Sequence, residues 1–124
     1  IIGIGITEHP HADGFPKAVL TKDPEGRWMS FWEENKDGAL GIAVILGAGE
    51  SPAGFAHEPP AKSPGNANNL LLVSAKDGAP VRYFTGAAWS GSGQFKDRAA
   101  WEDHVRKHAE RALKPMSIAV SARP

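Results

Sequence analysis

Two apolar, β-prone runs, residues 27–33 (RWMSFWE) and 40–46 (LGIAVIL), are separated by a few residues that include the turn sequence 35–38 (NKDG). Parallel strands need a crossover of about a dozen residues or more, whereas antiparallel strands can be joined by a tight turn. A third β-prone run, residues 17–22, precedes another turn sequence, residues 23–26 (DPEG), in which proline and glycine suit a tight reversal. This part of the chain therefore predicts three consecutive antiparallel strands.

Further strands are predicted on both sides of these three. Residues 1–7 alternate isoleucine with glycine, and residues 116–121 alternate apolar with small or polar side chains, which predicts a terminal strand with one buried face. Residues 70–73 and 81–85 are also β-prone, and the Asp-Gly pair at 77–78 between them is a strong hairpin signal. The fold class predicted is mainly β, an antiparallel β-sandwich.

One helix is expected near the C-terminus, over residues 98–114. Asp97 is a suitable N-cap, and Pro115 ends the helix. The helix carries a stripe of mostly apolar side chains: Trp101, Val105, His108, Ala109 and Ala112. We expect Trp101 and Val105 to pack on a sheet face and His108 to be a partly buried core histidine.

The segment 47–67 (GAGESPAGFAHEPPAKSPGNA) is rich in glycine, proline and serine, and we expect it to be irregular. Loops longer than about 12–15 residues in compact domains are usually functional or disordered. Phe55, His57 and Glu58 favour an ordered binding loop here. His57 can serve as a general acid or base, because histidine titrates near neutral pH, and the alternative is a solvated loop histidine.

Aromatic residues provide the other candidate site. Trp28, Trp32 and Trp101 are expected in the core, whereas Trp89 stands between alanines and the Ser-Gly-Ser-Gly stretch 90–93. Small neighbours allow a flat ligand such as a sugar to approach Trp89 and stack on it. Tyr83 can join this site or pack in the core. Since Arg82 and Tyr83 are adjacent on a strand, we expect only one of them to face the ligand.

Composition narrows the class of ligand. The chain of 124 residues has 14 basic and 14 acidic residues, so no net field attracts nucleic acid or an anionic membrane. The absence of cysteine excludes thiolate metal sites and a cysteine nucleophile. We therefore expect a small neutral or mildly acidic ligand, and no cofactor is predicted.

The sequence His9-Pro10-His11-Ala12-Asp13 is a candidate metal site. His9, His11 and Asp13 alternate along an extended segment, so they can face one side and bind a metal ion. The sequence superficially resembles the metal motif of metallo-β-lactamase-like hydrolases, but Gly14 stands where that motif has another histidine. The alternatives are a metal-dependent hydrolase and a polar loop without metal, and we assign no metal ligand.

Several segments together resemble the C-terminal half of the domain-of-unknown-function 4861 family. They are residues 40–44 (LGIAV), 69–72 (NLLL) with Lys76, 83–84 (YF), 86–90 (GAAWS), Phe95, the helix with Trp101 and the final strand. The family comprises exported bacterial proteins often found beside unsaturated uronyl hydrolases and polysaccharide lyases. The resemblance implies a galactose-mutarotase-like supersandwich, a periplasmic or secreted location and action on uronic-acid oligosaccharides.

A supersandwich needs more strands than this chain supplies, so the resemblance implies that residues 1–124 are either a single sandwich domain or the C-terminal portion of a larger one. The remainder of a longer sandwich is then a partner, together with the oligosaccharide. The start at Ile1-Ile2-Gly3 also resembles a chain entered in mid-strand. We therefore expect residues 1–6 to form an exposed sheet edge or to pair with other sequence.

The implied reaction is an elimination by a lyase or dehydratase, which requires a cation for the sugar carboxylate, a base and an acid. Arg82 or Lys76, with Asn68 or Asn69, can hold the carboxylate, while His57 and Tyr83 exchange protons and Trp89 supports the ring. We expect His57 and Trp89 to line the same concave surface. The alternative function is a non-catalytic carbohydrate-binding module.

Overall fold

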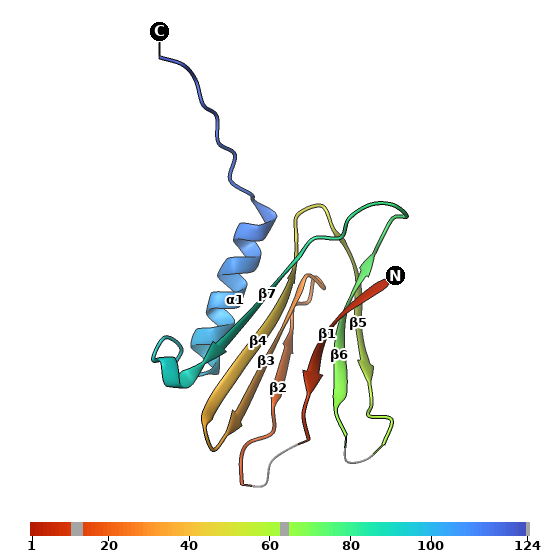
Figure 1. Cartoon of the computed structure of the whole chain (residues 1–124), viewed down its shortest axis with the longest axis vertical. Coiled ribbons are helices and arrows are strands. Elements are labelled where there is room, and N and C mark those ends of the chain that lie inside the picture. The colour runs from red at the N-terminus through yellow and green to blue at the C-terminus, as the bar shows by residue number, and fades with distance from the viewer. Residues whose placement is uncertain (11–13, 63–64, 124) are drawn as a thin grey trace.

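A computed structural model describes residues 1–10, 14–62 and 65–123 (Figure 1). Sheet A has three strands in the order β1 (Ile2–Glu8), β6 (Ala67–Ser74) and β5 (Ser51–Glu58). Sheet B has four strands in the order β2 (Val19–Lys22), β3 (Trp28–Asn35), β4 (Gly38–Leu46) and β7 (Tyr83–Trp89). The short helix η1 (Ser90–Ser92) and the helix α1 (Arg98–Leu113) follow. All strand pairs are antiparallel, which confirms the predicted β-sandwich with a C-terminal helix.

The three consecutive strands predicted from the short turns are β2, β3 and β4. β3 pairs with both neighbours, and Ser30 lies opposite Thr21 on one side and Ala43 on the other. In the turn before β3 the backbone N–H of Gly26 donates to the Asp23 carbonyl at 2.9 Å, and Gly26 has a φ of 73°. Glycine adopts this left-handed conformation without the steric cost that a Cβ would bring.

Two sequence predictions about strand pairing have different outcomes. β1 is an edge strand of sheet A, as expected, and its partner among the described residues is β6. The predicted hairpin between residues 70–73 and 81–85 is wrong, because β6 belongs to sheet A and β7 pairs with β4 in sheet B. The Asp-Gly turn does form, with the Ala79 N–H donating to the Lys76 carbonyl at 3.1 Å. A turn sequence reverses the chain but does not choose the sheet that the chain joins.

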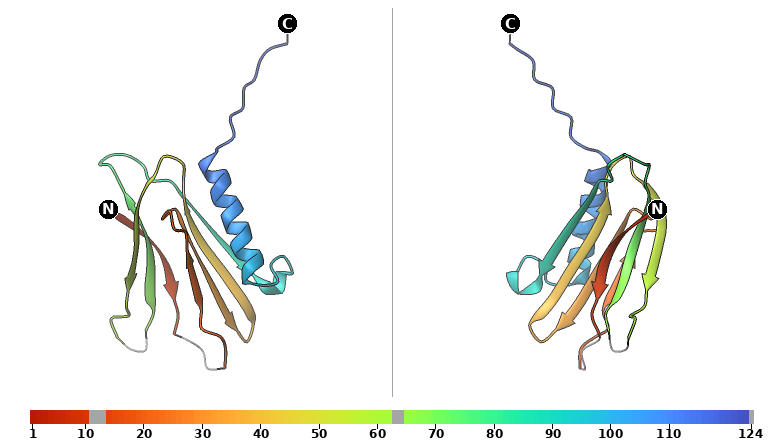
Figure 2. Two further views of the ribbon diagram at one scale, coloured as in Figure 1. Left: turned by 180° about the vertical axis from the view of Figure 1, so that it is seen from behind. Right: turned by 45° about the vertical axis from the view of Figure 1, so that its right-hand side comes forward.

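Two segments differ from the sequence prediction in secondary structure. The segment 47–67, expected to be irregular, contains strand β5, and its pairing with β6 shifts register between Pro52 and Gly54. β5 is an edge strand, where a proline is tolerated because its missing N–H can face solvent. Residues 116–121 form no strand, and Met116 and Val120 are exposed on the extended C-terminal segment (Figure 2). An alternating pattern of apolar residues is not sufficient for a strand when no neighbouring strand pairs with the segment.

The inner core lies between the two sheets. Its buried side chains come from β1, β3, β4 and β6: Ile4, Ile6, Met29, Phe31, Val44, Leu46, Leu71 and Val73. Alternate residues of each strand point to this core, as expected for strands with two distinct faces. β1 lies across from β4, and the ammonium of Lys22 in β2 lies 5.4 Å from the ring centre of Phe55 in β5. The strands of sheet A therefore cover β4, β3 and β2.

The outer core lies between sheet B and α1 (Figure 2). It contains Trp32, Ala39, Ala43, Ile45, Ala88, Phe95, Trp101, Val105 and Ala109, and Trp28 packs against it. The predicted burial of Trp28, Trp32, Trp101 and Val105 is confirmed, although Trp28 is only partly buried. The prediction for His108 is wrong, because its side chain is exposed at the margin of the helix stripe.

Trp101 fixes the distance between the helix and the sheet. The indole is only 3% exposed, and it lies so close to Gly41 that a Cβ at this position would be 2.8 Å from three indole atoms. The side chain of Asp97 caps the helix by accepting from the Ala100 N–H at 2.9 Å, as predicted. On the exposed face, a hydrogen bond from Lys107 holds the pKa of Asp103 below its usual value. No helix in the described part of the chain is long and apolar enough to cross a membrane.

We predict that Gly41→Ala lowers the free energy of unfolding by about 1–3 kcal/mol, because the added methyl group must displace the Trp101 indole. Gly86→Ala is the matched control, since its Cβ would lie 3.9 Å from the same indole, an ordinary contact distance. Denaturant unfolding of both variants measures the difference. Equal stability of the two variants would show that the indole does not press on Gly41.

Replacement of Trp101 with Ala should cost about 3–5 kcal/mol, because it removes a buried aromatic side chain and leaves a cavity between α1 and sheet B. Thermal unfolding followed by circular dichroism measures the effect. An unchanged melting temperature would show that α1 does not depend on this side chain.

Candidate functional site

β7 exposes one of its faces along its whole length. Tyr83, Thr85, Ala87 and Trp89 alternate along the strand and lie opposite residues of β4 that face the inner core, such as Leu46 and Val44. All four side chains are nevertheless exposed, with Tyr83 at 50% and Trp89 at 53%. We call these four residues the β7 inner face. It is a sandwich surface without a covering strand in the described part of the chain.

Trp89 is held in place although half of it is exposed. Its indole Nε1–H donates to the backbone carbonyl of Asp37 at 3.0 Å. Gly91 lies against the ring so closely that a Cβ there would be 2.3 Å from an indole carbon. A side chain fixed in this way loses little further conformational entropy when a ligand stacks on its open surface. The structure therefore provides a pre-organised aromatic platform, which fits the sequence interpretation of Trp89.

Cationic groups lie near the other end of β7. Lys76 and Arg82 line a cavity of about 310 Å³, with residues 48–51 and 79–81 forming much of its remaining wall. The side chain of Glu50 accepts a hydrogen bond from the backbone N–H of Arg82 at 3.0 Å, and this bond holds the segment that leads into β7. Since Arg82 immediately precedes Tyr83, this cavity adjoins the start of the β7 inner face.

A polar row crosses the three strands of sheet A at one end of the inner core. Asn69 Nδ2 donates to Glu8 Oε2 at 3.1 Å, and Asn69 Oδ1 lies 3.0 Å from His57 Nδ1. Because the amide oxygen can only accept, His57 Nδ1 carries the hydrogen and the neutral imidazole keeps a lone pair on Nε2. This Glu8–Asn69–His57 row orients an exposed imidazole with a basic nitrogen directed away from the amide.

Asn68 belongs to a separate row on the outer face of sheet A. Thr7 donates to Asn68 Oδ1 at 3.1 Å, and Asn68 Nδ2 lies 3.5 Å from Glu58 Oε2. Neighbouring residues of a strand point to opposite faces, so Asn68 and Asn69 cannot contact the same small ligand from the two sides of the sheet.

The predicted site residues therefore lie in separate places. His57 and Asn69 share the Glu8–Asn69–His57 row, Lys76 and Arg82 share the cavity of about 310 Å³, and Trp89 lies on the β7 inner face. The expectation that His57 and Trp89 share one concave surface is wrong. His57 is on β5, which lies across from β2, whereas β7 is at the other edge of sheet B. The segment expected to cover the site is instead an edge strand.

Sequence reasoning missed the acidic members of this end of the sandwich. Glu8 continues the inward-facing series of Ile4 and Ile6, which is the signal that could have revealed it. Glu8 also lines a cavity of about 280 Å³ with His9 and Glu33, and His9 Nδ1 lies 3.7 Å from Glu33 Oε2. Of the residues considered for a metal, His11 and Asp13 lie outside the described residues. Within residues 1–10, 14–62 and 65–123, no group of three or more potential ligands could hold a metal ion.

Comparison with known proteins assigns a family. Residues 2–118 match the family described as a domain of unknown function, DUF4861, so the chain belongs to this family. No curated protein and no solved structure matches the chain. The family assignment agrees with the resemblance seen in the sequence, and it does not name a ligand or a reaction.

We predict that His57 carries its hydrogen on Nδ1 when the imidazole is neutral, and that Asn69→Ala removes this preference by removing the acceptor. Nitrogen-15 NMR of the imidazole measures the tautomer directly. His9 is the control in the same spectra: its Nδ1 faces Glu33, so Asn69→Ala should leave its tautomer unchanged. A native His57 with an unprotonated Nδ1 would contradict this orientation of the imidazole.

Proposed function

We propose that this domain binds oligosaccharides that contain uronic acids along the β7 inner face. The observation that carries the proposal is Trp89, whose indole is held by Asp37 and Gly91 while the residue stays 53% exposed on a face that no described strand covers. Sugars present flat faces of C–H groups, which pack on aromatic rings. The resemblance of the chain to the DUF4861 family implies action on uronic-acid oligosaccharides, and this supports the choice of ligand.

The spacing of the aromatic residues favours an oligosaccharide over a single sugar. Tyr83 and Trp89 are six residues apart on one strand face, which corresponds to about 20 Å at the usual rise of a β-strand. Thr85 and Ala87 between them are small and exposed. A chain of several sugar rings can therefore lie between the two aromatic residues without a bulky side chain in its path.

Charge supports an acidic ligand. Two cationic side chains, Lys76 and Arg82, and one carboxylate, Glu50, line the cavity that adjoins the Tyr83 end of the β7 inner face. Arginine and lysine donate strong hydrogen bonds to carboxylates, and arginine can bind both oxygens of one carboxylate. A uronic acid bound near Tyr83 would lie next to this cavity, although the whole chain has no net charge.

A second candidate function is elimination from a uronic acid, as a lyase or dehydratase. The Glu8–Asn69–His57 row favours it, because an oriented imidazole with a bare Nε2 is suited to remove the α-proton. Tyr83, Lys76 and Arg82 do not lie at the Glu8–Asn69–His57 row. The reaction therefore needs its acid and its carboxylate-binding group from other residues.

The cellular setting follows from the same resemblance and forms part of the proposal. Family members are exported bacterial proteins, so we propose a periplasmic or secreted location. The edge strand β1 also suits the proposal that further strands of a longer sandwich are partners of this chain.

Trp89→Ala should weaken binding of a uronic-acid oligosaccharide by roughly 1–3 kcal/mol, by analogy with stacking of other flat ligands. Phe84→Ala is the matched control: Phe84 is 47% exposed on the same strand but points to the opposite face. Isothermal titration calorimetry measures both. Equal weakening by the two variants, or none by Trp89→Ala, would place the ligand on another surface.

For the second candidate, the wild-type protein should generate the ultraviolet absorbance of an unsaturated uronic acid. His57→Ala should then lower turnover by about 10²–10⁴-fold, as expected for loss of a proton-transfer group, with little loss of stability. His9→Ala is a control for the loss of a histidine at the same end of the sandwich. Binding without any absorbance change would exclude elimination by this chain and leave a carbohydrate-binding function.

A further inference from the structure

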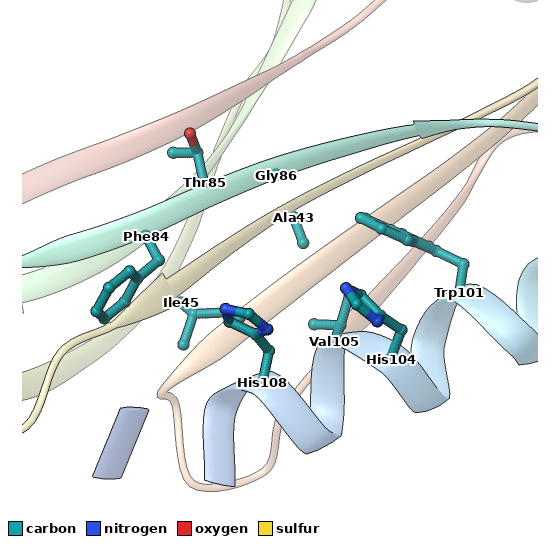
Figure 3. A pocket seen from close by; sticks show the side chains of 9 residues that line it. All are labelled: Ala43, Ile45, Phe84, Thr85, Gly86, Trp101, His104, Val105 and His108. Atoms are coloured by element: carbon teal, nitrogen blue, oxygen red, sulfur yellow. The ribbon is translucent and has the colours of Figure 1, made fainter. Parts of the chain in front are cut away.

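Two histidines of α1 form a pair outside the sites described above. His104 and His108 are four residues apart, so they lie on the same face of the helix. Both side chains are exposed, their ring centres are 5.6 Å apart and their planes differ by 36°. Figure 3 shows both rings projecting from α1 toward β7, at a cavity also lined by Phe84 and Ile45.

The position of His104 is fixed by aromatic contacts. Its ring stacks on Trp101 with centres 5.9 Å apart and an interplanar angle of 21°. The Phe95 ring meets His104 edge-on, with centres 5.0 Å apart. In the described part of the chain neither histidine of the pair makes a hydrogen bond or an ion pair through its side chain. The ring nitrogens are therefore available to another partner.

We propose that His104 and His108 chelate one divalent metal ion of the late first transition row, such as Cu²⁺, Ni²⁺ or Zn²⁺. Two imidazoles that share one metal at about 2.0–2.1 Å per nitrogen have ring centres on the order of 5 Å apart. The observed 5.6 Å requires only a small rotation of the His108 side chain, since aromatic contacts hold His104. Histidines at this helical spacing bind zinc in the metalloprotease motif, which shows that the spacing is adequate.

The ligand atoms available at the pair determine the class of metal. The carboxylate of Asp103, which precedes His104 on the helix, is already engaged by Arg106 and Lys107. Arg111 lines a neighbouring cavity together with His108. Mg²⁺ and Ca²⁺ require several oxygen ligands, which the pair does not supply, whereas imidazole nitrogens suit copper, nickel and zinc.

A bidentate site leaves coordination positions open. These positions face the cavity of about 170 Å³ between α1 and β7, whose lining is mainly apolar. Water or a donor atom of a small ligand can fill them. The cavity lies on the helix side of sheet B, so this site is separate from the β7 inner face.

Titration of the protein with NiCl₂ or CuSO₄ tests the proposal, with tryptophan fluorescence as the readout because Trp101 stacks on His104. The wild type should show saturable quenching at one equivalent. His108→Asn should weaken binding by about 10²-fold, since loss of one ligand removes the chelate advantage. His57→Asn is the control and should leave the affinity unchanged. Equal affinity of the wild type and His108→Asn would overturn the proposal.

A double variant of unchanged composition tests the geometry. Arg106→His combined with His108→Arg places the histidines two residues apart, on different sides of the helix. The wild type should gain thermal stability on addition of NiCl₂, because the metal binds the folded helix. The double variant should gain none, and MgCl₂ should stabilise neither protein. Equal stabilisation of both proteins by NiCl₂ would also overturn the proposal.

Discussion

Sheet A has three strands and sheet B has four, so the two sheets cannot cover each other completely. β1 lies across from β4 and β5 across from β2, so no strand among the described residues faces β7. Burial of apolar surface drives the packing of the other strands. Tyr83 and Trp89 of β7 point to the same side of sheet B as the inner-core residues of β4, but both remain exposed. The difference in strand number thus creates the surface on which the proposed binding function depends.

The helix makes this exposed strand structurally possible. α1 packs on the outer face of sheet B through Trp101 and Val105, and Ala88 of β7 is buried in the same core. β7 is therefore anchored by its hydrogen bonds to β4 and by the burial of Ala88, whereas Phe84 on the same face stays exposed. The contact of Trp101 with Gly41 leaves its indole N–H without a hydrogen-bond partner in the described part of the chain. A buried N–H without a partner lowers stability, so its presence here indicates how strongly close packing determines the position of the helix.

Local sequence signals predicted the elements whose partners are close in the chain. The short turns predicted the β2–β3–β4 order, and the apolar stripe with Asp97 predicted α1. Local signals failed where pairing with a strand distant in the sequence determines the structure. The Asp-Gly turn at 77–78 leads to a strand of the other sheet. β5 forms despite Pro52 because it pairs with β6. The same holds for the site. The exposure of Trp89 was predictable from its small neighbours, whereas Glu8, Asn69 and His57 come together only through pairing across three strands.

The central claim is that the β7 inner face is the ligand-binding surface. Amide chemical shifts recorded during titration with a uronic-acid oligosaccharide test it residue by residue without any substitution. We expect the largest changes on residues 82–89 and on the Trp89 indole N–H, whose hydrogen bond to Asp37 reports on the platform. The largest changes around His57 and Asn69, or on α1, would contradict the claim and move the ligand to another face of the sandwich.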